Sequence, residues 1–97
     1  MKDQINAAIQ VLPEGSKDFA YNIVDEAINE IKKSGMEYRV CPFETVVEGN
    51  YEEVMKMIER IRDVCYQKGA NNLIVNIKLQ FRKNTDVFIS DKMKKYS

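Results

Sequence analysis

The sequence contains no histidine. This absence excludes Ser-His-Asp and Cys-His nucleophile activation, and it excludes any metal site built on histidine. Carboxylates alone could hold Mg²⁺ or Ca²⁺, but no D-x-D-x-D-G loop supports such a site. The two cysteines, Cys41 and Cys65, form no C-x-x-C motif. We therefore expect a protein with no metal and no cofactor that is not an enzyme.

An excess of charge and a long apolar run are also missing. Lys and Arg number 15, as do Asp and Glu, so the formal net charge is zero. A neutral chain argues against nucleic-acid or membrane-surface binding and leaves self-association unopposed. No apolar run approaches the ~18 residues of a membrane span, and the first residues lack the apolar region of a signal peptide. We expect a cytoplasmic protein with free thiols, in which Cys65 packs on the apolar face of a helix.

Hydrophobic periodicity predicts four strands and two long helices. Apolar and polar residues alternate at period two in the first and last strands, and apolar residues recur at helical spacing between them. The first helix is expected to end at about Ser34, and Asn50 is expected to cap the second. Ser90 can cap a last helical turn over residues 91–96. The predicted strands cover residues 4–12, 37–41, 41–49 and 72–82.

The order β-α-β-β-α-β predicts a ferredoxin-like α+β sandwich, with residues 1–97 as its single domain. Its sheet should have the strand order 4-1-3-2, with both long helices on one face and a short helix near the C-terminus. The third strand carries Glu44 and Glu48 although it lies inside the sheet. The fold hosts many unrelated functions, so function must be argued from a site.

The face of the sheet without helices is the candidate site. Amide side chains and alanine are poor strand formers, yet they occur here on two strands that should be neighbours. Amides offer the paired donors and acceptors that suit a flat heterocycle or a protein partner. Strict alternation cannot place Thr45 and Glu48 on one face, but Pro42 could induce a bulge, so both arrangements stay open. The other residues expected on this face are Asn6, Ala8, Gln10, Asn76, Lys78, Gln80 and Arg82.

Several short motifs together resemble one known family. The sequence T-V-V-E-G at residues 45–49, followed by E-V-M at 53–55, is similar to the T-x-(I/V)-E-G motif and ensuing helix of the small thiamine-binding proteins. The resemblance also takes in Q-V-L-P at 10–13, V-N-I-K at 75–78 and D-K at 91–92. It therefore covers nearly the whole chain in order and spacing.

The resemblance implies a cytoplasmic protein that binds thiamine or its hydroxymethylpyrimidine moiety without turning it over, for vitamin scavenging or carriage. It also implies a homodimer or homotetramer assembled through its sheets, with the pocket formed where protomers meet. A carboxylate such as Glu48 could receive the exocyclic amine or offset the thiazolium charge, and an aromatic ring such as Phe43 or Tyr21 could lie against the thiazolium. The implied ligand-binding residues are Thr45, Glu48, Gln10, Asn76, Lys78, Arg82 and Phe43.

Other functions of this fold fit less well. An RNA-binding version needs basic and aromatic residues on the third strand, where Glu44 and Glu48 would repel phosphate. An acyl-phosphate hydrolase needs an arginine in an anion-cradling loop after the first strand, and residues 13–17 read P-E-G-S-K. The serious alternative is a regulatory or assembly domain whose polar sheet face serves only self-association.

Overall fold

Strands and helices follow one another in the order that the periodicity predicts. The computed structural model describes residues 4–96. The expectation that no signal peptide is present concerns mainly residues 1–3, which lie outside the described residues. No helix within this part of the chain is long and apolar enough to cross a membrane. The elements are β1 (Gln4–Pro13), α1 (Lys17–Lys33), β2 (Glu37–Val40), β3 (Thr45–Asn50), α2 (Tyr51–Gln67), β4 (Leu73–Gln80) and α3 (Ile89–Met93).

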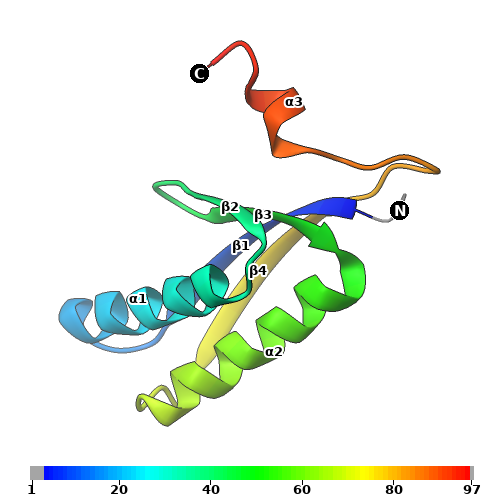
Figure 1. Ribbon diagram of the computed structural model, residues 1–97. Helices are drawn as coiled ribbons and strands as arrows, with labels where there is room; N and C mark the ends of the chain where they lie inside the picture. Colours follow the sequence, from blue (N-terminus) through cyan, green and yellow to red (C-terminus); the bar gives the residue numbers. More distant parts are fainter. Residues whose placement is uncertain (1–3, 97) are drawn as a thin grey trace.

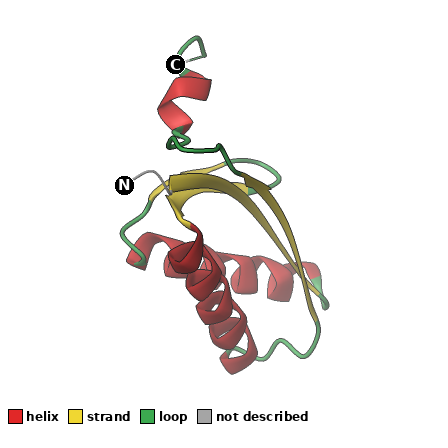
Figure 2. Cartoon of the chain, turned by 90° about the vertical axis from the view of Figure 1, so that its right-hand side faces the viewer, coloured by secondary structure: helices red, strands yellow, loops and turns green. Residues whose placement is uncertain are grey.

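The four strands form one antiparallel sheet in the order β2-β3-β1-β4, which confirms the predicted order 4-1-3-2. Both long helices lie under one face of this sheet, and α3 stands on the opposite side (Figures 1 and 2). The ferredoxin-like sandwich with a short C-terminal helix is thus confirmed. We call the face away from α1 and α2 the open face.

Local chemistry sets the ends of the long helices. Ser16 caps α1, where the Phe19 N–H donates to Ser16 Oγ at 3.2 Å, and Asn50 caps α2, where the Glu53 N–H donates to Asn50 Oδ1 at 2.9 Å. After α1 the chain turns through Gly35, whose φ of 79° lies in the left-handed region that favours glycine. Each of the two long helices therefore begins at a side-chain cap.

The core lies between the helices and the covered face of the sheet. Alternate residues of β1 enter it, as the period-two pattern predicts, and meet one stripe of each helix. Burial raises the pKa of the Cys65 thiol, and the charge of Glu26 raises it further. The fully enclosed residues of this core are Ala7, Ile9, Ile23, Ala27, Ile31, Val47, Val54, Met57, Ile61, Cys65 and Ala70.

Three element boundaries were predicted wrongly. The third strand begins at Thr45, because Cys41 to Glu44 form a tight connection in which the Cys41 N–H donates to the Glu44 carbonyl at 2.9 Å. Pro42 lies in this connection and so introduces no bulge within the strand. Strand β4 ends at Gln80, which leaves Arg82 outside the sheet. Helix α3 begins before Ser90, and no side chain caps it.

The segment that precedes α3 is tied to the first strand. The Val87 N–H donates to the Gln4 carbonyl at 2.9 Å, and the Gln4 N–H donates to Asp86 Oδ1 at 3.0 Å. The Asn6 side-chain amide donates to the Val87 carbonyl at 3.1 Å. Finally, the Ile89 N–H donates to Glu48 Oε1 at 2.6 Å. These bonds hold the C-terminal segment against one end of the open face.

We expect the two free thiols to react at very different rates. Cys65 is 0% exposed, and its raised pKa reduces the reactive thiolate, whereas Cys41 is half-buried in the β2–β3 connection. Titration of the native protein with Ellman's reagent should show one fast thiol, which Cys41→Ser removes and Cys65→Ser retains. In urea both thiols of the unsubstituted protein should react. Equal rates in the native state would contradict this packing.

We also expect Glu48 to anchor α3. In Glu48→Ala the Ile89 N–H loses a charged acceptor, an interaction worth about 1.5–3 kcal/mol, so its hydrogen exchange should accelerate by about tenfold or more. Glu37→Ala is the matched control, since it removes the neighbouring carboxylate on β2 and no bond to α3. Unchanged exchange at Ile89 in Glu48→Ala would show that the anchor lies elsewhere.

Candidate functional site

Strand register settles which faces Thr45 and Glu48 occupy. Thr45 lies opposite Ile9 of β1 and therefore points to the helix side of the sheet. Glu48 lies opposite Asn6 and points to the open face. The two residues of the motif thus lie on opposite faces, and strict alternation holds through β3.

A cavity opens where the sheet is incomplete, beside Thr45. Pairing of β1 with β3 ends at Ile9, whereas pairing of β1 with β4 continues to Pro13. Residues 10–13 consequently have one strand edge that no described strand covers, and its main-chain groups are free to bind. This edge, α1 and the connection 41–44 enclose about 260 Å³, which we call the hairpin cavity.

The hairpin cavity joins an apolar wall to an exposed aromatic rim. Its wall comes from α1, and Thr45, only 5% exposed, lies at its floor. Phe43 is 81% and Tyr21 60% exposed, although both rings border it. Lys17 Nζ already lies 5.8 Å from the centre of the Tyr21 ring, in a cation–π arrangement. The residues of α1 in the wall are Val24, Ala27, Ile28 and Ile31.

Three predicted residues border the hairpin cavity, Thr45, Gln10 and Phe43, although the side chain of Gln10 points to the open face. The Asn76 side-chain amide donates to Gln10 Oε1 at 3.1 Å, which places Asn76 beside this group on the neighbouring strand. Lys78 Nζ lies 3.3 Å from Glu44 Oε1, and Glu44 also borders the cavity. Asn76 and Lys78 are therefore linked to the cavity through neighbours and do not line it.

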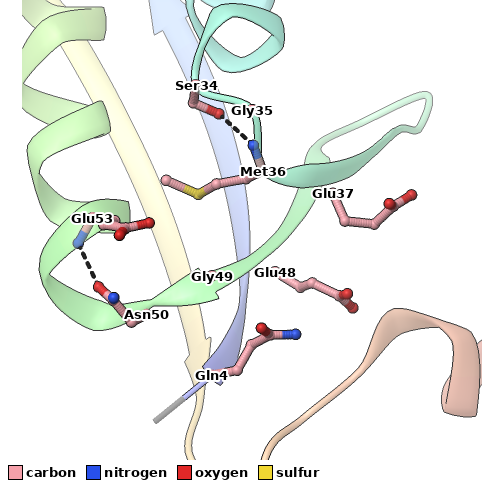
Figure 3. A pocket seen from close by; sticks show the side chains of 9 residues that line it. All are labelled: Gln4, Ser34, Gly35, Met36, Glu37, Glu48, Gly49, Asn50 and Glu53. Atoms are coloured by element: carbon pink, nitrogen blue, oxygen red, sulfur yellow. Dashed lines mark hydrogen bonds between the residues drawn. The ribbon is translucent and has the colours of Figure 1, made fainter. Parts of the chain in front are cut away.

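Glu48 lies in a different hollow of about 310 Å³ at the far end of β3. Figure 3 shows Gln4, Glu37 and Glu48 pointing to the open side, while Met36 points toward the helices. Glu37 and Glu48 are direct cross-strand neighbours, and one Glu48 oxygen is occupied by the Ile89 N–H. Within residues 4–96 no group of three or more potential ligands could hold a metal ion.

Arg82 is also separated from the rest. It lies beyond β4 in a surface hollow with Tyr51 and Phe81, whose ring centres are 5.9 Å apart. Burial, followed by the charge of Arg82, lowers the pKa of Lys92 on α3. The fold therefore distributes the seven predicted residues over several places and brings only three of them into one cavity.

Sequence reasoning missed the free edge of β1. Its signal is a difference in strand length, because β1 has 10 residues and β3 has six. It also missed Leu12 and Val40, two exposed apolar residues that extend the rim of the hairpin cavity. Periodicity reports the direction of a side chain and says nothing about where a neighbouring strand stops.

Comparison with known proteins gives consistent results. The family model described as "Thiamine-binding protein" matches residues 7–97. A UPF0045 protein of Clostridium perfringens is 29% identical over 97% of this chain and 98% of its own length. A solved domain of unknown function, DUF77, from Bacillus cereus is 32% identical with a TM-score of 0.91, covering 100% of this chain and 93% of that one.

A second solved structure carries a more specific description. It is a proposed thiamine biosynthesis/salvage protein of Thermotoga maritima, 26% identical, with a TM-score of 0.90 over 97% of this chain and 99% of that one. The resemblance inferred from the motifs is therefore confirmed over nearly the whole chain. The chain belongs to the thiamine-binding protein family.

Proposed function

We propose that the chain binds thiamine or its hydroxymethylpyrimidine moiety in the hairpin cavity, without turning it over, and serves in scavenging or carrying the vitamin in the cytoplasm. The observation that carries the proposal is the convergence of Thr45, Gln10 and Phe43 on one cavity in a chain of this family. No nucleophile with an activating base borders the cavity in the described part of the chain, which favours binding without chemistry.

The cavity offers a match for each half of the ligand. An aminopyrimidine presents adjacent donors and acceptors, and the uncovered edge of residues 10–13 presents main-chain carbonyls and the Val11 N–H, since Pro13 has no N–H. The Thr45 hydroxyl adds a side-chain partner, whereas the Gln10 amide lies on the open face beside Asn76. The thiazolium is a cation, and the exposed rings of Phe43 and Tyr21, together with the Glu44 carboxylate, suit a positive charge.

Size and exposure indicate that a second copy completes the pocket. Sites for small molecules usually measure about 300–1,000 Å³, so a cavity of about 260 Å³ holds the pyrimidine more readily than the whole vitamin. Its rim is apolar and exposed, which is typical of a surface that meets a partner. The exposed rim residues are Leu12, Tyr21, Val40 and Phe43. We therefore propose a homodimer or homotetramer in which another protomer closes the cavity.

We propose that the other predicted residues act through a neighbouring side chain or from the second protomer. Asn76 orients Gln10, and Lys78 holds Glu44. Glu48 and Arg82 lie too far along the sheet to share the cavity within one chain, so they reach a ligand only when the second protomer supplies them.

One observation favours the alternative that the polar face serves self-association alone. Asn6 and Glu48, two polar groups of the open face, already bind the C-terminal segment of the same chain. Under this alternative the protein assembles but binds neither compound, which the next two experiments distinguish.

Ligand stabilisation and its loss in Thr45→Val test the binding site. A compound present at 100 times its Kd should raise the free energy of unfolding by about 2.7 kcal/mol. Valine keeps the β-branched shape but removes one hydrogen bond, worth about 1 kcal/mol or fivefold in affinity. Thr85→Val, in the exposed turn after β4, is the matched control. Thermal shift and calorimetry measure both effects. A Thr45→Val protein that binds the ligand as tightly as the original would show that the Thr45 hydroxyl does not bind it.

Phe43→Leu tests the aromatic rim. Leucine keeps apolar surface for the second protomer but removes the ring, so assembly should persist while thiamine affinity falls by about 0.5–2 kcal/mol. Hydroxymethylpyrimidine has no thiazolium and should lose much less. Phe81→Leu removes another exposed ring, 61% exposed and outside the cavity, and should not change the affinity for either compound. Sedimentation and calorimetry are the readouts. Assembly without any binding would support the alternative function.

A further inference from the structure

A second cavity lies on the open face, and its floor is a row of four residues across all four strands. Each neighbouring pair is in direct register, so their side chains lie side by side. The two central side chains are small and apolar, and the two outer ones are basic. From β2 to β4 the row reads Arg39, Val46, Ala8 and Lys78.

Helix α3 forms the other wall. It stands over the open face (Figures 1 and 2), where Ile89 and Met93 supply apolar surface and Lys92 a third basic group. The space between α3 and the row measures about 340 Å³, which we call the sheet-face cavity. It is within the range of about 300–1,000 Å³ that small-molecule sites occupy. A molecule with an apolar body and a polar end would fit the side chains around this cavity.

Asn6 gives the cavity an unsatisfied acceptor. Its side chain is 4% exposed and borders the cavity, and its Nδ2 donates to the Val87 carbonyl. Its Oδ1 is buried and accepts no hydrogen bond within the described part of the chain. Buried acceptors are nearly always paired, so a missing donor calls for an explanation. A molecule in the cavity that directs an N–H or O–H at Asn6 would supply that donor.

The charges around the sheet-face cavity favour an anion. Glu44 neutralises Lys78 at 3.3 Å, and within residues 4–96 neither Arg39 nor Lys92 forms a salt bridge. Burial, and after it the charge of Arg82, lowers the pKa of Lys92, so the ammonium at this wall is partly desolvated. An anionic group between Arg39 and Lys92 would supply both basic groups with a partner. Thiamine is a cation, so this cavity selects another class of compound.

We propose that the sheet-face cavity is a second binding site, distinct from the hairpin cavity, for a small ring carboxylate that carries one hydrogen-bond donor. The ring lies on Ala8 and Val46, the donor meets Asn6 Oδ1, and the carboxylate lies between Arg39 and Lys92. The occupant is a small molecule rather than a second copy of the chain, because the cavity is enclosed by α3 of the same chain.

Three related probes separate these interactions. 4-Hydroxybenzoate has the ring, the donor and the charge; benzoate lacks the donor; 4-hydroxybenzyl alcohol lacks the charge. NMR titration should show that 4-hydroxybenzoate binds most tightly and shifts the amides of Ala8, Val46 and Met93. Each of the other two should bind about fivefold or more weakly, since each lacks one polar interaction. Excess thiamine should leave the titration unchanged, and so should Thr45→Val.

Two variants locate the site. Ala8→Leu fills the cavity and should abolish binding, while Lys92→Gln changes an exposed side chain that does not affect folding and should weaken 4-hydroxybenzoate by about fivefold or more. Lys94→Gln is the matched control and should have no effect. If Ala8→Leu does not fold, the affinity of Lys92→Gln for 4-hydroxybenzoate still tests the site.

Three results would overturn the proposal. The first is the absence of shifts at these amides with every probe. The second is displacement of 4-hydroxybenzoate by thiamine, which would mean one shared site. The third is protection of the same amides by concentration-dependent association, which would make the open face an interface between copies. The first and third results do not bear on thiamine binding in the hairpin cavity, which Thr45→Val and Phe43→Leu test separately.

Discussion

The antiparallel pairing of β1 with β3, which ends where Ile9 meets Thr45, is the constraint on which the rest depends. Its register directs Thr45 toward the helices and Glu48 toward the open face. Its early end leaves the last part of β1 with an uncovered edge, because β4 continues alongside it to Pro13. A shift of one residue in this register would exchange the two faces of β3 and bury Glu48 in the core. The hairpin cavity is thus a product of strand length as much as of side-chain chemistry.

The neutral net charge of the chain conceals a sharp local separation of charge. Carboxylates gather at one end of the open face, where Glu37 and Glu48 lie side by side. Basic groups gather over its middle, around Arg39 and Lys92. The aromatic rim lies at the opposite end from the carboxylates, beside Thr45. One small sheet therefore carries carboxylates and basic groups on neighbouring parts of one face, and Glu37 and Arg39 lie only two residues apart on β2.

Local patterns predicted the fold well, since each element carries its own signal. Alternation identified β1 and β4, and Asn50 caps α2 as the sequence predicted. The site was predicted less well, because it depends on contacts between distant parts of the chain. Nothing near Glu48 in the sequence reveals that its acceptor is taken by Ile89, 41 residues away. The alternation of side chains along a strand could, however, have placed Thr45 and Glu48 on opposite faces if a bulge at Pro42 had not been considered.

The bonds from Gln4 to Asp86 and Val87 join residues 82 and 83 positions apart. Closing so long a loop is entropically slow, and contacts of this kind tend to form last. During synthesis, β1 therefore leaves the ribosome 82 residues before Asp86, the first residue of the segment that secures its end. Its alternating apolar side is exposed until α1 and α2 have followed and covered it, and in that interval the nascent chain is a natural client for chaperones.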